Sequence, residues 1–234
     1  MGAIYRREIG AFFSSSIAYV FLAVFYVFSG YFFSLNNLAT GSANMAGVFS
    51  NLFLVIIFLI PILTMRLFSE EKKQKTEQGL LTAPVSLTGI VLGKYFAALT
   101  LFLIGVSIVF IYGVILSLFG TVAWVTLVSN YIALLLLGAA FIAVGLFVSS
   151  LTENQVVAAV GGFVVLMLLY MIDVIASAVH VSWLQSLLYQ LSFYSRYYEF
   201  TCGIFNLSSV LFYVSTAVLF NFFTVRVFEK RRWS

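Results

Sequence analysis

Three residues with the side chains of a hydrolase triad lie close together near the end of a long apolar segment. Asp173, Ser177 and His180 fall at i, i+4 and i+7, on one face of a helix. A Ser-His-Asp hydrolase needs these side chains to meet beside an oxyanion hole, whereas a straight helix spaces them in a row along its axis. Two other interpretations stay open: polar residues where a helix leaves the membrane, or a hydrogen-bonded cluster at the outer mouth of a path. We therefore expect no catalytic residue here.

A second candidate for chemistry is the segment Gly89-Ile-Val-Leu-Gly93-Lys94-Tyr95. A P-loop has four residues between its glycines and a Ser or Thr after the Lys, but here three residues separate them and Tyr95 follows. The sequence also lacks H-E-x-x-H and C-x-x-C motifs, and Cys202 is its single cysteine. We expect no metal and no cofactor to be bound by this chain.

The composition places these residues in a membrane protein. Of the 234 residues, 63% are hydrophobic and 9% are charged, and the mean hydropathy is +1.11. A soluble domain with so few charges could not cover its own surface, so the class is all-α and polytopic. The partner implied by this composition is the lipid bilayer, and we expect no binding to nucleic acid.

Six apolar segments are long enough to cross a bilayer as helices, and together they form one transmembrane domain, 1–234. They are 17–35, 48–67, 89–118, 127–149, 156–178 and 207–228. Residues 1–16 precede them, with Tyr5, Ile9 and Phe12 at helical spacing, which is typical of an interfacial helix. Pro61 lies inside the second span, where it removes a backbone donor; a tolerated kink or a hinge would both fit. Lys94 is expected to snorkel to the interface.

The polar segment 69–85 separates the second and third spans. Six of the eight residues from Glu70 to Glu77 are charged, and at about 3 kcal/mol each they would cost on the order of 15 kcal/mol at a bilayer centre. The segment must therefore lie in water. We expect a short helix capped by Ser69 and supported by a Glu71–Lys75 pair.

Six spans put both termini on one side, and the basic residues indicate which side it is. All but one of them fall on the side of the termini: Arg6, Arg7, Arg66, Lys72, Lys73, Lys75, Lys94, Arg226, Lys230, Arg231 and Arg232. By the positive-inside rule this side is cytoplasmic. The segment 180–206 then lies outside, and we expect it to form one or two interfacial or re-entrant helices, with Arg196 and Glu199 as a local ion pair.

Several motifs, in order along the chain, resemble those of ABC-2 type permeases, especially the subfamily related to the gliding-motility permease GldF. They are Arg7-Glu8 with Phe13 and Ile17-Ala18-Tyr19, Arg66-Leu67-Phe68-Ser69-Glu70-Glu71-Lys72, Leu80-Leu81-Thr82-Ala83-Pro84-Val85-Ser86, Ile90-Val91-Leu92-Gly93-Lys94, and 149–159. Two departures matter. Ser16 stands where a proline is common at the start of the first span, and where the family often has Gly-Thr-x-Glu, this chain has Lys75-Thr76-Glu77-Gln78. The second departure leaves open which of Glu70, Glu71 and Glu77 inherits the coupling contact.

The resemblance implies an ABC-2, type V exporter-like permease fold in the plasma membrane of a prokaryote. Two such subunits, identical or not, would form a pathway between them, and each would dock a separate ATPase that binds ATP and Mg²⁺. An accessory protein with an extracytoplasmic domain is a further partner of that family. The residues implied in ATPase coupling are Glu70, Glu71, Lys72, Lys73, Lys75, Thr76, Glu77, Pro84 and Glu153. Those implied in an outer gate are Asp173, His180, Tyr194, Arg196, Tyr197, Tyr198 and Glu199, with Pro61 as a hinge.

Two alternatives to an exporter permease remain at this stage. A self-contained channel or ion-driven carrier would need a polar lining in its spans, for which Asp173 alone is thin support. A membrane docking or assembly subunit would keep segment 69–85 as a binding site without any transport.

Overall fold

The computed structural model describes residues 1–76, 79, 85–179 and 181–232, and within these ranges it contains helices and no strand. The predicted sites Glu77, Pro84 and His180 lie outside the described residues. The helices are α1 (Gly2–Ser14), α2 (Ser16–Phe33), the π-helical turn η1 (Ser34–Leu38), α3 (Ala46–Thr64), α4 (Arg66–Lys73), α6 (Leu87–Val106), α7 (Ile108–Ser117), α8 (Trp124–Leu151), α9 (Gln155–Ala178), α10 (Ser182–Leu191), α11 (Phe193–Thr201) and α12 (Leu207–Arg232).

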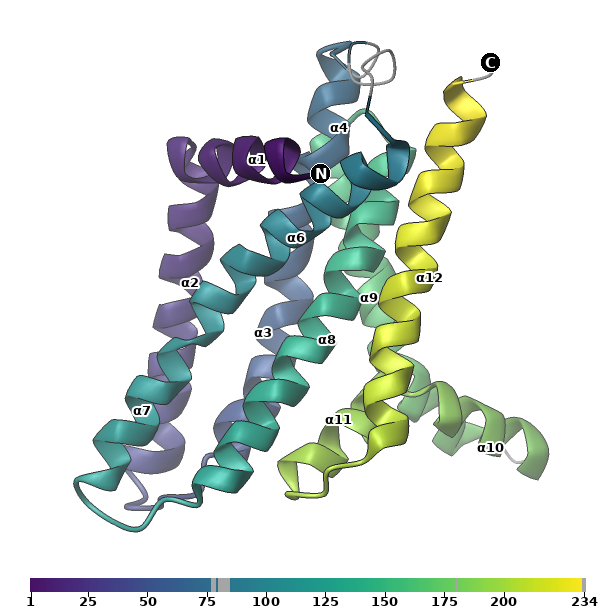
Figure 1. The fold of residues 1–234 in the computed structure, drawn as a ribbon. Coiled ribbons are helices and arrows are strands. Elements are labelled where there is room, and N and C mark those ends of the chain that lie inside the picture. Colours follow the sequence, from purple (N-terminus) through teal and green to yellow (C-terminus); the bar gives the residue numbers. More distant parts are fainter. Residues whose placement is uncertain (77–78, 80–84, 180, 233–234) are drawn as a thin grey trace.

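Six helical segments of the described chain are long and apolar enough to cross a membrane, which confirms the predicted all-α polytopic fold. They are Ser16–Leu38, Ala46–Lys73, Leu87–Ser117, Trp124–Leu151, Gln155–Ala178 and Leu207–Arg232. They run side by side, and both termini lie at the same end of the bundle (Figure 1). At this end α1 lies across the bundle and α4 projects from it. We call it the basic end, because Arg6, Arg7, Arg66, Lys72, Lys73 and Lys75 lie on these two helices and the turn after α4.

The helix α8 is the centre of the bundle. Within an apolar 18-residue stretch of α8, 67% of the residues are buried in the chain, against 17% in the corresponding stretch of α9. Small residues allow this close packing: a Cβ at Gly138 would lie 2.1 Å from a ring carbon of Phe102, and one at Gly145 would lie 2.3 Å from Thr64 Oγ1. Because lipid tails are as apolar as leucine, such close approach of helix backbones drives association in a bilayer.

Two predicted elements differ from the structure in detail. The third span is interrupted at Ser107, between α6 and α7, where the Ser107 hydroxyl donates to the Leu103 carbonyl oxygen at 2.7 Å. The prediction that Ser69 caps the helix of the polar segment is wrong. The helix α4 begins at Arg66, directly after α3, and Ser69 lies inside it and donates to the Met65 carbonyl oxygen. Inside a helix, a serine hydroxyl can donate to the carbonyl oxygen four residues before it, and Ser69 does so instead of capping.

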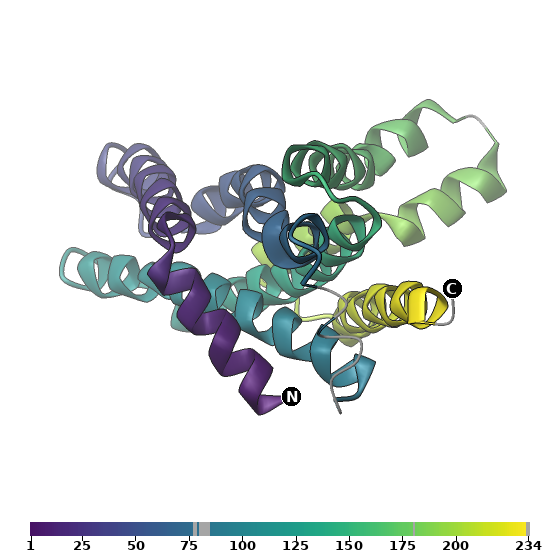
Figure 2. The ribbon, with the colours of Figure 1, turned by 90° about the horizontal axis from the view of Figure 1, so that it is seen from above.

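At the end of the bundle opposite the basic end, the segment 181–206 contains two helices, α10 and α11 (Figure 1). None of the residues of α10 is buried, and this helix projects to one side of the bundle (Figures 1 and 2). In contrast, α11 buries Phe193, Tyr197 and Phe200 against the spans. At this end of the bundle α11 therefore packs against the spans, while α10 is supported chiefly by α9.

Candidate coupling site at the basic end

Lys94 on α6 is almost completely enclosed, with 1% of its side chain exposed. Its Nζ lies 3.1 Å from Glu8 Oε1 on α1 and 2.9 Å from Glu71 Oε1 on α4, and it donates to the Leu67 carbonyl oxygen at 2.7 Å. The expectation that Lys94 snorkels to the interface is wrong. Its ammonium turns inward because two carboxylates and a carbonyl replace the water that it leaves.

Arg7 completes this group, since its Nη2 lies 2.8 Å from Glu8 Oε1 and 2.5 Å from Glu71 Oε1. Two cations therefore face two anions, and the sum of their charges is zero. We call Arg7, Glu8, Glu71 and Lys94 the charge cluster. It connects α1, α4 and α6, three helices that are far apart in the sequence.

The environment of Glu8 has two opposing effects on its ionisation. Burial favours the neutral acid, but the charges of Lys94 and Arg7 and their hydrogen bonds outweigh it, so that the pKa of Glu8 lies below its ordinary value. The hydrogen bond from Arg7 to Glu8, against the cost of burial, raises the pKa of the Arg7 guanidinium. Both groups are therefore ionised at neutral pH, and the cluster is a network of charges.

The apolar contacts around the cluster fix the same three helices. The Phe68 ring centroid lies 5.2 Å from Lys94 Nζ, within the range of a cation–π contact. Next to Lys94, Gly93 permits close approach of α1, since a Cβ there would lie 3.0 Å from Ile4 Cγ2. The interfacial helix is thus seated directly on the start of α6.

A second set of contacts ties α4 to α8 and to the turn after α8. Ser149 Oγ donates to the Met65 carbonyl oxygen at 2.9 Å and accepts from the backbone N–H groups of Phe68 and Ser69, each at 3.3 Å. Further along, Lys72 Nζ lies 3.2 Å from Glu153 Oε1. The structure therefore brings together α4 and the turn at Glu153, two of the segments that the resemblance assigns to coupling.

The remaining residues implied in coupling have different surroundings. Glu70 pairs with Arg66 at 3.2 Å, whereas Lys73, Lys75 and Thr76 are exposed. The predicted Glu71–Lys75 helical pair is wrong: α4 ends at Lys73, Lys75 adopts a left-handed backbone with φ 57°, and Glu71 turns to the charge cluster. Sequence reasoning missed Arg7, Glu8 and Lys94 as members of one network. The signal was a charged dipeptide and a lone lysine in otherwise apolar helices.

At the end of the bundle opposite the basic end, Asp173 holds α11 against α9. Its Oδ2 accepts from Ser192 Oγ at 2.6 Å and its Oδ1 accepts from Ser195 Oγ at 2.7 Å. Ser177 instead donates to the Val174 carbonyl oxygen of its own helix. The arrangement of Asp173 is that of a hydrogen-bonded latch between two helices.

The aromatic and charged residues of α11 divide between the core and the surface. Tyr197 is fully buried and donates to the Phe49 carbonyl oxygen at 2.9 Å, while Tyr198 is exposed. Tyr194 packs edge-on against Tyr170, with ring centroids 5.6 Å apart.

The predicted Arg196–Glu199 ion pair is wrong. Arg196 donates to the Gln190 carbonyl oxygen at 2.8 Å and lies over the Phe212 ring, while Glu199 accepts from Asn206 and Ser209 at 3.1 Å. Each side chain thus links α11 to a neighbouring segment, so the two point to different partners.

Pro61 is buried in α3, and a Cβ on Gly162 of α9 would lie 3.3 Å from Pro61 Cβ. The second and fifth spans therefore come close to each other at the proline.

Taken together, the basic end offers buried charge pairs and tight helix contacts, which suit the transmission of a change in position better than a covalent step.

The comparison with known families covers almost the whole chain. Residues 9–231 match the family model described as ABC-2 family transporter protein. No curated protein gives a significant match. The matched region includes the first five spans, the sixth up to Arg231, the helix α4, and two of the four residues of the charge cluster, Glu71 and Lys94. The family is the membrane component of ABC transporters, with ATP hydrolysis on a separate subunit. The chain therefore belongs to the ABC-2 family, as a membrane-spanning permease subunit of an ABC transporter.

Proposed function

We propose that this permease subunit is driven by a separate ABC ATPase that docks on the basic end, and that the basic end faces the cytoplasm of a prokaryote. The observation that carries the proposal is the joint surface of α4 and the turn at Glu153, linked by the 3.2 Å contact between Lys72 and Glu153. Its exposed charges at Lys73, Lys75 and Glu153 suit a soluble protein partner. ATP and Mg²⁺ would bind to the ATPase.

The charge cluster supports a route by which docking would act on the spans. A displacement of α4 would be transmitted to α6 and α1 through the contact between Glu71 and Lys94, and to α8 through the hydrogen bonds of Ser149. Interfaces of this kind have discrete packed arrangements and transmit displacement as a unit. The closing of the ATPase would thus move several spans together.

A second permease subunit, the same chain or a relative, would cover the faces of α3 and α9 that this chain leaves exposed. Phe58 on α3 stacks on Phe163 of α9 with centroids 4.8 Å apart, and beside them Val160, Val164 and Leu168 are exposed. We propose that the transporter exports its substrate and that this chain belongs to the GldF-like subfamily. We also propose that α11, with its hydrogen bonds to Asp173, forms the outer gate of the pathway. An accessory protein with an extracytoplasmic domain would meet this outer end.

The test is co-purification of the full chain with its ATPase from the native membrane in mild detergent. The variant carries K73E, K75E and E153K, which reverse three exposed charges and leave the buried cluster intact. The matched control is R6E, an exposed charge on α1 at the same end. The proposal is supported if a Walker-motif ATPase co-purifies with the wild type and with R6E but not with the triple variant. Equal recovery with all three proteins, or no ATPase after crosslinking, contradicts it.

A membrane docking subunit without transport would pass the same test. A measurement at the outer end distinguishes a transporter from a docking subunit. In a transporter, non-hydrolysable ATP added to the complex changes the fluorescence of Trp183 on α10, whereas in a docking subunit this fluorescence stays constant. A channel or carrier would recover no ATPase.

A further inference from the structure

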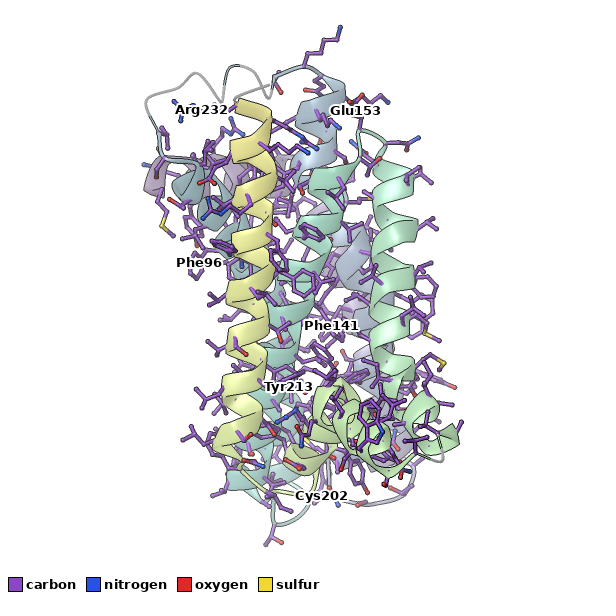
Figure 3. All side chains as sticks on the ribbon, turned by 90° about the vertical axis from the view of Figure 1, so that its right-hand side faces the viewer. Phe96, Phe141, Glu153, Cys202, Tyr213 and Arg232 are labelled. Atoms are coloured by element: carbon purple, nitrogen blue, oxygen red, sulfur yellow. The ribbon has the colours of Figure 1, made fainter. Side chains whose placement is uncertain are left out.

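A groove of about 560 Å³ runs along the outside of the bundle between α6, α8 and α12. Its walls are mainly aliphatic and aromatic, with Leu92, Phe96 and Leu99 on α6 and Val214, Val218 and Val225 on α12. Figure 3 looks onto α12, with Phe96 beside it and Tyr213 nearer the end of the bundle that carries Cys202. The coupling surface at α4 and Glu153 is a separate region.

The polar residues of the groove are placed at particular depths. Arg226 and Glu229 line the mouth at the basic end, with Arg226 Nη1 2.5 Å from Glu229 Oε2. Deeper in the wall is Asn221, which is 7% exposed; its Nδ2 donates to the Ala217 carbonyl oxygen at 2.8 Å. Its Oδ1 has no hydrogen-bond partner among the described residues. A buried carboxamide oxygen without a donor is costly unless an occupant supplies one.

The length of the groove matches one leaflet of a bilayer. From Glu229 to Tyr213 the helix α12 rises by about 24 Å, at roughly 1.5 Å per residue. Half of a bilayer including its headgroups is about 20 to 22 Å thick. A lipid whose headgroup lies at the mouth would therefore reach to the far end of the groove with its acyl chain.

We propose that this groove binds one phospholipid with a zwitterionic phosphate and amine headgroup, of the phosphatidylethanolamine type, from the leaflet at the basic end. Arg226 presents five N–H donors of which the Nη1 contact with Glu229 uses only part, and the rest suit a phosphate. Glu229 beside it is an acceptor for the ammonium group. Below the mouth, the second Nδ2 hydrogen of Asn221 can donate to an ester oxygen of the lipid, and a water that accompanies the headgroup can donate to its Oδ1. One acyl chain fills the groove between α6 and α12.

Charge is what selects this occupant over others. An anionic lipid would bring its phosphate to Arg226 but would leave Glu229 facing negative charge. The paired opposite charges at one mouth fit a headgroup that itself carries both charges.

The experiment uses the full chain, purified in mild detergent with any subunits that stay bound, and exchanged with dioleoyl phosphatidylethanolamine or dioleoyl phosphatidylglycerol. Native mass spectrometry counts the retained lipid. We expect one phosphatidylethanolamine per chain, preferred over phosphatidylglycerol by about tenfold, the ratio that corresponds to one charge-assisted hydrogen bond of about 1.4 kcal/mol. The variant V218W fills the groove and removes this lipid. L219W, at a neighbouring exposed position of α12 that does not line the groove, keeps it.

Two further variants separate the roles of the mouth residues. R226Q lowers the retention of both lipids by about tenfold, because both carry the phosphate. E229Q abolishes the preference for phosphatidylethanolamine, because both the partner of the ammonium and the repulsion of the anionic lipid are gone. The proposal is overturned if V218W retains as much lipid as the wild type, if the two lipids bind the wild type equally, or if V218W releases a protein subunit instead of a lipid.

Discussion

Lys94 Nζ on α6 lies 2.9 Å from Glu71 Oε1 on α4, so a buried ion pair holds the third span to the helix that extends the second. The same ammonium also meets Glu8 of α1. If α4 moved away, the two cations Lys94 and Arg7 would share Glu8 alone, and if α1 moved away, Lys94 would lose one of its two carboxylates. The interfacial helix and α4 thus share one anchor. This relationship sets the consequences of removing any member of the cluster.

Among the residues of the charge cluster, we expect replacement of Lys94 to destabilise the chain most. In Lys94→Met the carboxylates of Glu8 and Glu71 lose their buried partner, and we expect the free energy of unfolding to fall by about 3 to 5 kcal/mol. The measurement is thermal unfolding of the purified chain in detergent, followed by tryptophan fluorescence. Lys73→Met, at an exposed position, serves as control and leaves the midpoint nearly unchanged. If adding Glu8→Gln and Glu71→Gln to Lys94→Met restores nothing, the loss is one of packing, and the electrostatic account fails.

The cluster also makes stability depend on pH in one direction. The pKa of Glu8 is lower in the folded chain than its ordinary value of 4.5. The contribution of the ionised carboxylate is therefore fully present above about pH 4.5 and is lost as the pH falls through the lower, folded-state pKa. We expect the difference in unfolding midpoint between wild type and Glu8→Gln to be largest near neutral pH and to shrink in acid. A difference that stays constant down to about pH 3 would contradict this, because Glu8 would then not be the titrating group.

What the sequence could predict follows from how local each property is. The six spans depend on runs of apolar residues, and the interfacial helix depends on the spacing of Tyr5, Ile9 and Phe12, so both can be inferred without neighbours. The direction in which the Lys94 side chain points cannot be inferred in this way. It is buried instead of snorkelling because Glu8 and Glu71, on other helices, lie beside its ammonium group. Likewise Ser69 has the residue type of a cap, but α4 follows α3 so closely that a carbonyl is present four residues before it.

The end of the bundle opposite the basic end shows the same limit of inference from local sequence. The aromatic residues of 180–206 predicted helices at the membrane surface, but not that Tyr197 would be buried while Tyr198 is exposed. The spacing of Arg196 and Glu199 suggested a local pair, yet Arg196 finds a carbonyl oxygen and an aromatic ring, and Glu199 finds Asn206. Local spacing offers one partner, and the fold offers several.

The centre of the bundle tolerates no added volume at Gly138. A Cβ there would lie 2.1 Å from a ring carbon of Phe102, so we expect Gly138→Ala to lower the free energy of unfolding by about 1 to 3 kcal/mol through overpacking. The control is Gly105→Ala, where the nearest atom would lie at an ordinary 3.4 Å. Unfolding midpoints in detergent compare the two. Adding Phe102→Leu to Gly138→Ala should recover part of the loss, and a loss of the same size in both glycine variants would contradict the packing account.

Cys202 gives a direct measurement of orientation, because it is the single cysteine of the chain, it is exposed, and it lies at the opposite end of the bundle from Glu153 (Figure 3). A thiol that faces the outside reacts with a membrane-impermeant maleimide in intact cells. We therefore expect Cys202 to be labelled without permeabilisation. In Cys202→Ser with Lys73→Cys the thiol moves to the basic end, and labelling should then require permeabilised cells. If instead the Lys73→Cys thiol is labelled in intact cells and Cys202 only after permeabilisation, the orientation of the chain is the opposite one. The surface of α4 and Glu153 would then lie outside the cytoplasm, which would rule out the docking of an ATPase there.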